Sequence, residues 1–212
     1  MNRDGLRSFV YRYYEDPLSS FFCWLGFSAN GVTYLGLLII IVSAYLISQG
    51  YLWIGGILVI IGGALDLIDG AIARKKGIDS KFGALLDSIS DRLQEALVLF
   101  GLLVYYTQSG CTVSVFGFDV CDIAVMSTYT AFVASVMVSY LRARAEGLGI
   151  QCRIGIMTRP ERLAIVATGL ILTVWVDWIM VFGLVSLTVL GLMTTAQRMI
   201  HTAKVINDDQ TR

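Results

Sequence analysis

Residues 53–73, WIGGILVIIGGALDLIDGAIA, form an apolar run as long as a helix that crosses a bilayer core, about 20 residues for about 30 Å. Two aspartates, Asp66 and Asp69, stand inside this run, although ionised side chains are costly within a membrane. Similar runs lie on either side. The predicted membrane spans are residues 30–48, 53–73, 83–107, 121–142, 161–178 and 181–203.

The composition of the whole chain also indicates a membrane protein. Of its 212 residues, 56% are hydrophobic and only 15% are charged, a balance that soluble domains of this length rarely reach. The formal net charge is zero, which gives no reason to expect a nucleic acid or another polyanion as a partner. We therefore expect one all-α integral membrane domain over residues 1–212, with a six-helix bundle at 30–203.

The distribution of basic residues predicts the orientation of the chain. Lys and Arg are absent from the connections near residues 49–52, 108–120 and 177–180, and they are abundant in the other connections. The positive-inside rule then places both termini and the aspartates on the cytoplasmic side of a multi-pass cell-membrane protein. Residues 1–25 interleave charged and aromatic side chains, so they are expected to form a cytoplasmic juxtamembrane amphipathic helix; a disordered tail is the alternative.

Of the four cysteines, Cys23 and Cys152 are expected on the reducing side and have no spacing around them that is typical of metal ligands. Cys111 and Cys121 both fall in the predicted outer connection, where a disulfide can form if that side of the membrane is oxidising. A disulfide and two free thiols are therefore both compatible with the sequence.

Four aspartates carry the main functional signal. Asp66 and Asp69 are three residues apart, and Asp87 and Asp91 are four apart, so each pair projects from one face of its helix. Simple placement at the membrane boundary and structural salt bridges with nearby arginines are the alternatives. However, four carboxylates from neighbouring helices cannot all stay ionised at close range without added positive charge. Oxygen ligands suit Mg²⁺ or Mn²⁺, and two such ions could clamp a transferring phosphoryl group.

The stretch that contains these aspartates is DLIDGAIARKKGIDSKFGALLDSISD, residues 66–91. It resembles the signature of the CDP-alcohol phosphotransferase family, DxxDGxxAR followed by eight residues and GxxxDxxxD. The positions in register are Asp66, Asp69, Gly70, Ala73, Arg74, Gly83, Asp87 and Asp91. The resemblance implies transfer of a lipid phosphate group from CDP-diacylglycerol or CDP-archaeol to an alcohol, with release of CMP. It also implies six membrane helices, a juxtamembrane helix and a homodimer.

The resemblance further implies a role for each signature residue. Asp66, Asp69 and Asp87 would be the main metal ligands, while Asp91 would be the general base and would also touch a metal ion. The segment SANGVT, residues 28–33, is similar to the family's PNxxT, with Ala29 in place of proline; a helix N-cap explains Ser28 or Asn30 equally well. The residues expected to bind the CDP-lipid are Asn30, Thr33, Asp66, Asp69, Gly70, Ala73, Arg74 and Gly83.

Arginines near the last three spans predict the second substrate. Arg142 and Arg144 end the fourth span, Arg159 precedes the fifth, and Arg198 lies within the sixth. Guanidinium groups bind phosphate oxygens in pairs, so these side chains suit an acceptor that already carries a phosphate. The strings RARAEGLG and RPER resemble the subfamily that uses myo-inositol 1-phosphate, although Arg142 stands where that subfamily often has Lys. Positive-inside bias alone accounts for some of these arginines.

Two other functions remain open at this point. Glycerol 3-phosphate is the closest alternative acceptor, because it would also need arginines. A transporter could use membrane-embedded acids as an ion path, but it would spread them across the depth of the membrane. Glu95, one turn beyond Asp91, is expected to pair with Arg92, with contact to a sugar hydroxyl as the alternative.

Overall fold

A computed structural model describes residues 14–77, 80–108, 114–115, 118–152, 154–176 and 178–210. Within these residues the chain forms helices joined by short connections. The helices are α2 (Asp16–Trp24), α3 (Ala29–Ser48), α4 (Leu52–Lys76), α5 (Lys81–Gln108), α6 (Val120–Gly147), α7 (Arg159–Leu172) and α8 (Ile179–Gln210). The strands β1 (Ser114–Val115) and β2 (Phe118–Asp119) pair antiparallel between α5 and α6.

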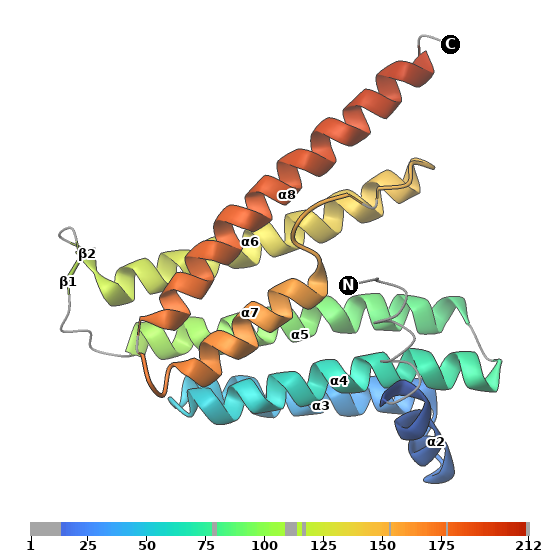
Figure 1. Ribbon diagram of the computed structural model, residues 1–212, viewed down its shortest axis with the longest axis horizontal. Coiled ribbons are helices and arrows are strands. Elements are labelled where there is room, and N and C mark those ends of the chain that lie inside the picture. Colours follow the sequence, from blue (N-terminus) through green and yellow to red (C-terminus); the bar gives the residue numbers. More distant parts are fainter. Residues whose placement is uncertain are drawn as a thin grey trace.

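The helices form a bundle in two connected halves. α3 packs against both α4 and α5, and α6 packs mainly against α8. α5 and α7 join the halves, because α5 also contacts α6 while α7 contacts both α4 and α8. Figure 1 shows that α6 and α8 extend away from α3, α4 and α5 toward the C-terminus, and that α2 lies at an angle to the bundle beside the end of α4.

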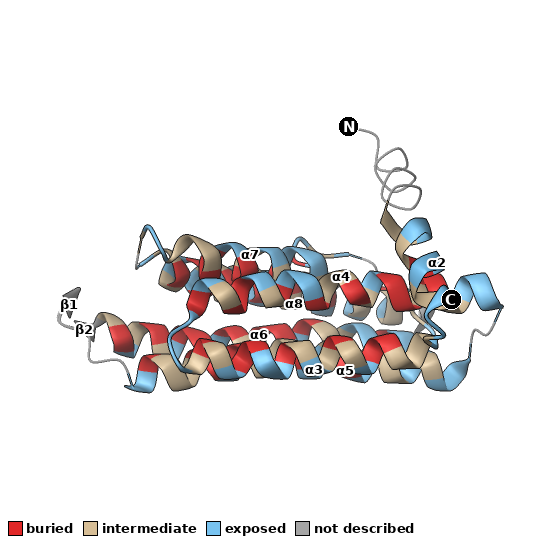
Figure 2. Cartoon of the chain, turned by 90° about the horizontal axis from the view of Figure 1, so that it is seen from below, coloured by how far each residue is buried: buried red, intermediate tan, exposed pale blue. Residues whose placement is uncertain are grey.

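The outer surface of the bundle is apolar, as a membrane protein requires. Large hydrophobic side chains are exposed along the helices, and Figure 2 shows exposed residues repeating along the outside of the bundle. Examples are Leu38, Ile41, Ile60, Phe100, Phe182 and Val189. Among the described helices, α3, α4, α6 and α8 are long and apolar enough to cross a membrane. The described part of the chain is therefore all-helical apart from the short hairpin, and its apolar helices are those of a membrane protein.

The six predicted spans each overlap one of the helices α3 to α8, but two of these helices are less typical of membrane spans. α5 carries five charged residues, all between its start and Glu95, which are Lys81, Asp87, Asp91, Arg92 and Glu95. α7 has only 14 residues and ends at Leu172 instead of reaching 178. The Thr173 hydroxyl donates to the Gly169 carbonyl at 2.7 Å at this early end. α6 and α8 continue past the predicted ends at 142 and 203.

The juxtamembrane prediction is only partly covered by the structure. Residues 1–13 lie outside the described residues, and α2 begins at Asp16. The side chains of Phe21 and Trp24 are exposed on α2, at 52% and 80% respectively. On its other side, α2 contributes Leu18 to a small hydrophobic cluster that includes residues of α3 and α4. α2 is thus a surface helix with an apolar contact to the bundle.

The helix ends and close contacts follow from particular residues. The Ser28 hydroxyl accepts a hydrogen bond from the Gly31 N–H at 3.1 Å, so Ser28 is the N-cap of α3. Gly77 ends α4 in the left-handed conformation, with φ +62°. In the middle of the bundle, a Cβ atom at Gly101 of α5 would lie 2.5 Å from the Ala44 carbonyl oxygen of α3. Glycine therefore allows α3 and α5 to approach closely, as is common between membrane helices.

The cysteine prediction is tested at three of the four positions. Cys121 takes part in a disulfide, whereas Cys23 and Cys152 are free thiols. The predicted partner of Cys121, Cys111, lies outside the described residues. The pairing of Cys111 with Cys121 therefore stays a prediction.

Candidate functional site

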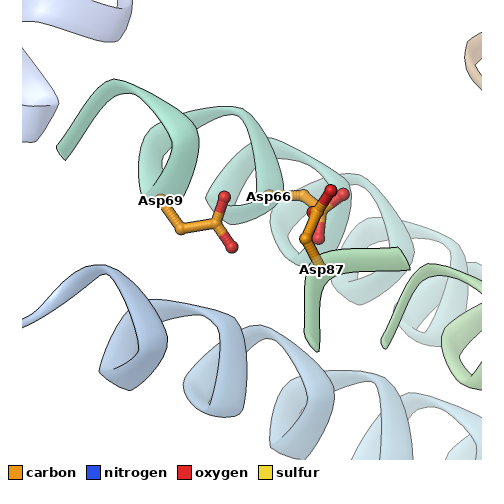
Figure 3. Close-up of side chains that lie close together, drawn as sticks. All are labelled: Asp66, Asp69 and Asp87. Atoms are coloured by element: carbon orange, nitrogen blue, oxygen red, sulfur yellow. The ribbon is translucent and has the colours of Figure 1, made fainter. Parts of the chain in front are cut away.

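Three of the four predicted aspartates form one compact group between α4 and α5. Carboxylate oxygens of Asp66, Asp69 and Asp87 lie within 4.8 Å of one another. Figure 3 shows the three side chains directed toward a common space between their helices. Asp69 is only 5% exposed. Three carboxylates at this separation repel one another unless positive charge lies between them or beside them.

The neighbouring polar side chains hold two of these carboxylates in place. The Thr33 hydroxyl of α3 is buried and donates to Asp69 Oδ2 at 2.5 Å. Gln94 of α5 is also buried, and its Nε2 donates to Asp66 Oδ1 at 3.3 Å. α3 therefore contributes to a site whose acids come from α4 and α5.

The fourth aspartate, Asp91, is joined to this group through an arginine. Arg159, the first residue of α7, donates a hydrogen bond from Nη1 to Asp66 Oδ2. The same nitrogen lies 2.8 Å from the buried Asp91 Oδ1, as an ion pair without the alignment of a hydrogen bond. Arg159 was predicted to bind the acceptor phosphate, and the structure places it directly beside the acids.

The chemistry of the acidic group suits a divalent cation. The three aspartates offer carboxylate oxygens as metal ligands, and these are the ligands that Mg²⁺ and Mn²⁺ prefer. A metal ion also supplies the positive charge that three close carboxylates need. The hydrogen bond from Thr33 also holds Asp69 in place, as metal-binding carboxylates commonly require. The site therefore fits a metal ion held by Asp66, Asp69 and Asp87.

Several of the residues predicted to bind the CDP-lipid lie close to one another and to the acids, whereas the Arg74 guanidinium pairs with Glu15. A Cβ atom at Gly83 would lie 3.7 Å from Asn30 Oδ1, so the start of α3 is close to the start of α5. Gly70 likewise lies one helical turn before Arg74, and a Cβ atom there would be 3.3 Å from Arg74 Nη1. Arg74 itself is 57% exposed and pairs with Glu15 at 2.9 Å, so its guanidinium points toward the N-terminal segment.

A polar cavity of about 360 Å³ opens beside the acidic group. Residues of α5, among them Asp87 and Asp91, form one wall, and residues of α6, α7, α8 and the connection before α7 form the others. Its arginines are Arg92, Arg142, Arg159, Arg162 and Arg198. The volume falls in the range of small-molecule sites. A small anion could therefore bind next to the carboxylates.

Three of the five cavity arginines are paired with carboxylates. Arg142 Nε lies 2.9 Å from Glu146 on the same helix, with both side chains about half exposed. Arg162 is buried and binds both carboxylate oxygens of Glu95, at 2.7 and 3.0 Å. Arg159 pairs with Asp66 and Asp91. Arg159 and Arg162 are therefore already neutralised to a large extent, whereas the half-exposed pair of Arg142 is weak.

The other two cavity arginines, Arg92 and Arg198, are bonded to backbone carbonyls. Arg92 Nη1 donates to the Ser88 carbonyl of its own helix. The buried Arg198 donates from Nε to the Ile154 carbonyl at 2.9 Å and from Nη1 to the Val138 carbonyl at 2.5 Å. In the described part of the chain, neither arginine has a carboxylate within 4 Å. Their positive charge is therefore available to a bound anion.

The structure departs from the sequence prediction at two acceptor-side residues. Glu95 pairs with Arg162 of α7 and not with Arg92, so the predicted pair on α5 is wrong. The guanidinium fork of Arg162 faces Glu95 and binds both oxygens, which is the stronger arrangement. Arg144 is exposed and does not line the cavity. Arg162 was not proposed from the sequence, although its spacing from Arg159 places both on one face of α7.

Comparison with known proteins gives a consistent assignment. The sequence matches the CDP-alcohol phosphatidyltransferase family over residues 27–190. It is 32% identical to an archaetidylinositol phosphate synthase of Methanothermobacter thermautotrophicus, with 95% of each chain covered. It is 35% identical to a phosphatidylinositol phosphate synthase of Mycobacteroides abscessus, covering 87% of this chain and 81% of the relative.

A solved structure agrees with these relatives. The crystal structure of Mycobacterium tuberculosis phosphatidylinositol phosphate synthase with CDP-DAG bound superposes with a TM-score of 0.77 at 30% identity, covering 88% of this chain and 92% of the other. The same protein has been crystallised in complex with manganese and citrate. The matched residues 27–190 include the acidic group and most of the helices that line the cavity. This chain therefore belongs to the CDP-alcohol phosphatidyltransferase family and is a transferase of phospholipid biosynthesis.

Proposed function

We propose that the protein transfers a phosphatidyl or archaetidyl group from a CDP-activated lipid to a hydroxyl of myo-inositol 1-phosphate and releases CMP. The observation that carries this proposal is the position of the arginine-lined cavity directly beside the carboxylates of α5. An acceptor that bears a phosphate would bind there with its hydroxyl near the acids. The names of the relatives support the same acceptor.

In this proposal the acidic group holds the CDP end of the lipid. Asp66, Asp69 and Asp87 would hold two Mg²⁺ or Mn²⁺ ions, with Asp91 as a further ligand. When bound, such ions neutralise the diphosphate oxygens and act as a Lewis acid on the phosphorus that reacts. The side chains expected around the nucleotide are Asn30, Thr33, Gly70, Ala73, Arg74 and Gly83. To reach a diphosphate, Arg74 would have to exchange Glu15 for phosphate oxygens.

Asp91 is the general base of the proposed reaction. Its carboxylate accepts the proton of the attacking hydroxyl while the new oxygen–phosphorus bond forms at the β-phosphorus. The bond between that phosphorus and the CMP oxygen breaks, and CMP leaves. Asp91 lines the cavity and is joined to Asp66 through Arg159, so it stands at the boundary between the two proposed substrate sites.

The acceptor phosphate would be bound by the cavity arginines whose positive charge is not fully neutralised by a carboxylate. Arg198 and Arg92 are bonded only to carbonyls, and Arg142 has a weak, half-exposed partner. Arg159 contributes from the side of the acids. The exposed Arg144, also predicted from the sequence, lies outside the cavity lining and would at most attract the anion from a distance.

The membrane setting completes the proposal. The six helices from α3 to α8 would form the membrane-embedded bundle, in which the 14-residue α7 reaches only part of the way across, with both termini and the active site on the cytoplasmic side. Residues 1–25 would lie on the membrane surface, where the exposed Phe21 and Trp24 of α2 meet the headgroups. The protein would act as a homodimer. The donor, CDP-diacylglycerol or CDP-archaeol, would enter from the lipid side.

Acceptor selectivity tests this function directly. Purified protein in lipid nanodiscs receives CDP-diacylglycerol or CDP-archaeol, Mn²⁺ or Mg²⁺, and one acceptor at a time, and released CMP is measured. We expect release with myo-inositol 1-phosphate, little with serine or free inositol, and none with metal chelator present. Preferential use of glycerol 3-phosphate would replace the proposed acceptor, and equal release with free inositol would contradict the role of the arginines.

A further inference from the structure

The connection between α6 and α7 determines where the first residues of α7 lie. It ends in a capping box, in which the Thr158 N–H donates to Glu161 at 3.0 Å and Pro160 occupies the first turn. Arg159 and Arg162 belong to the start of α7 and line the cavity. Any shift of the connection near Thr158 would therefore move both arginines together.

α8 holds this connection through two polar side chains one turn apart. The hydroxyl of Thr194 is fully buried, accepts a hydrogen bond from the Met157 N–H at 3.0 Å and donates to the Leu190 carbonyl at 2.8 Å. Arg198 donates from Nε to the Ile154 carbonyl at 2.9 Å. Thus two backbone groups of the connection, three residues apart, are each bound to α8.

The backbone also lies too close to α8 at this point for any larger residue. Gly155 has φ +122°, a conformation that residues with a side chain rarely adopt. A Cβ atom there would lie 2.5 Å from Thr194 Cγ2. The methyl group of Thr194 is therefore in contact with the connection at Gly155, and its hydroxyl binds the N–H of Met157. Both parts of the side chain are used.

We propose that Thr194 is a positioning residue for the acceptor cavity. It touches neither substrate, and it acts by fixing Met157 and hence the start of α7, which carries Arg159 and Arg162. This inference rests on the proposed acceptor site. Arg198 shares the task, since two of its donors bind backbone and only its remaining N–H groups are free for an anion.

Three variants of the full-length protein test this proposal. Thr194→Val keeps the shape but removes the hydroxyl, and it leaves the buried Met157 N–H without its acceptor. Thr194→Ser keeps the hydroxyl. Thr195→Val is the matched control, because Thr195 donates to the Gly191 carbonyl at 2.9 Å within α8 and has no bond to the described residues of the connection. The steady-state constants for both substrates are measured in nanodiscs with Mn²⁺.

We expect Thr194→Val to raise KM for myo-inositol 1-phosphate about tenfold, a typical cost of one lost buried hydrogen bond, while KM for the CDP-lipid stays at the wild-type value. Thr194→Ser should restore most of the affinity, and Thr195→Val should match wild type. A Thr194→Val enzyme with a wild-type acceptor KM would overturn the proposal. Equal increases of both KM values would overturn it as well, because they would indicate general destabilisation.

Amide hydrogen exchange separates this proposal from the proposed function. The peptide that contains Met157 should exchange faster in Thr194→Val than in wild type or Thr195→Val, whatever the acceptor is. If wild type releases no CMP with myo-inositol 1-phosphate, the proposed function fails, and the exchange rates still decide whether Thr194 holds the connection. Unchanged exchange in Thr194→Val would refute the positioning role.

Discussion

The donor and acceptor regions of the site are built in different ways. The acids that face the proposed CDP-lipid all come from one stretch, residues 66–91, on two consecutive helices. The cavity arginines come from four helices, α5 to α8, and depend on the connection before α7. The acids of the donor side therefore come from one local stretch whose two helices both pack against α3, whereas the arginines of the acceptor side are brought together from distant segments. The variants below test whether the two sides can be changed separately.

The largest effect is expected at the boundary between the two regions. Asp91→Asn should lower kcat for CMP release about a thousandfold, because an amide cannot accept the proton of the attacking hydroxyl. KM for each substrate should change much less. Asp122→Asn, in the first turn of α6, is the control and should keep wild-type kcat. Normal turnover in Asp91→Asn would remove the general base from the proposed mechanism.

A change on the donor side should weaken metal binding and leave the acceptor side unchanged. Thr33→Val removes the hydrogen bond to Asp69, and loss of such a support typically weakens metal binding 10- to 100-fold. Calorimetric titration with Mn²⁺ measures this affinity directly. At saturating metal, the acceptor KM should equal that of wild type, and Thr33→Ser should bind metal normally. An unaltered Mn²⁺ titration in Thr33→Val would show that Asp69 needs no such support.

A change on the acceptor side should leave metal binding intact. Arg198→Gln should raise KM for myo-inositol 1-phosphate by tenfold or more, since hydrogen bonds to charged groups contribute about 1.5–3 kcal/mol. The matched change Arg144→Gln should have no such effect, because Arg144 is exposed and does not line the cavity. Equal losses in both variants would mean that the arginines act by long-range attraction and not by contact.

The smallest effect concerns the charge of Arg142. Glu146→Gln removes its half-exposed partner, and such surface pairs contribute only about 0.2–1 kcal/mol. With more free positive charge beside the cavity, KM for myo-inositol 1-phosphate should fall about twofold at low salt. Because exposed charges are screened, the difference should disappear at high ionic strength. A rise in KM would instead show that Glu146 contacts the acceptor.

The same contrast explains what could be predicted from the sequence. The spacings of Asp66 from Asp69 and of Asp87 from Asp91 are local, so helical geometry predicts that each pair shares one face of its helix. The packing of α4 and α5 against α3 then brings Asp87 next to Asp66 and Asp69. Apolar runs likewise located the helices. Their ends were less predictable, because hydropathy does not register a hydrogen bond such as that of Thr173, which lies where α7 stops.

The acceptor side needed the three-dimensional structure. Glu95 and Arg162 are 67 residues apart, and no local rule pairs them. Arg142 and Arg144 are two residues apart on one helix, so they point in different directions, and helical geometry could have excluded one of them from the cavity. In the sequence, Thr194 is one small polar residue within an apolar run, and nothing local distinguishes it. Its importance depends on a backbone N–H that comes from another segment.

The shortness of α7 has a consequence for how the acceptor arrives. Its 14 residues span about 21 Å, less than the apolar thickness of about 30 Å. Trp175 and Trp178 follow its far end and are 71% and 63% exposed, as side chains at a headgroup boundary are. In the proposed topology, Arg159 at the other end then lies below the headgroups of the opposite leaflet. A water-soluble anion would then reach the acids through the polar cavity, whose lining includes the half-exposed Arg142 and Glu146, so the cavity has to carry it below the level of the headgroups.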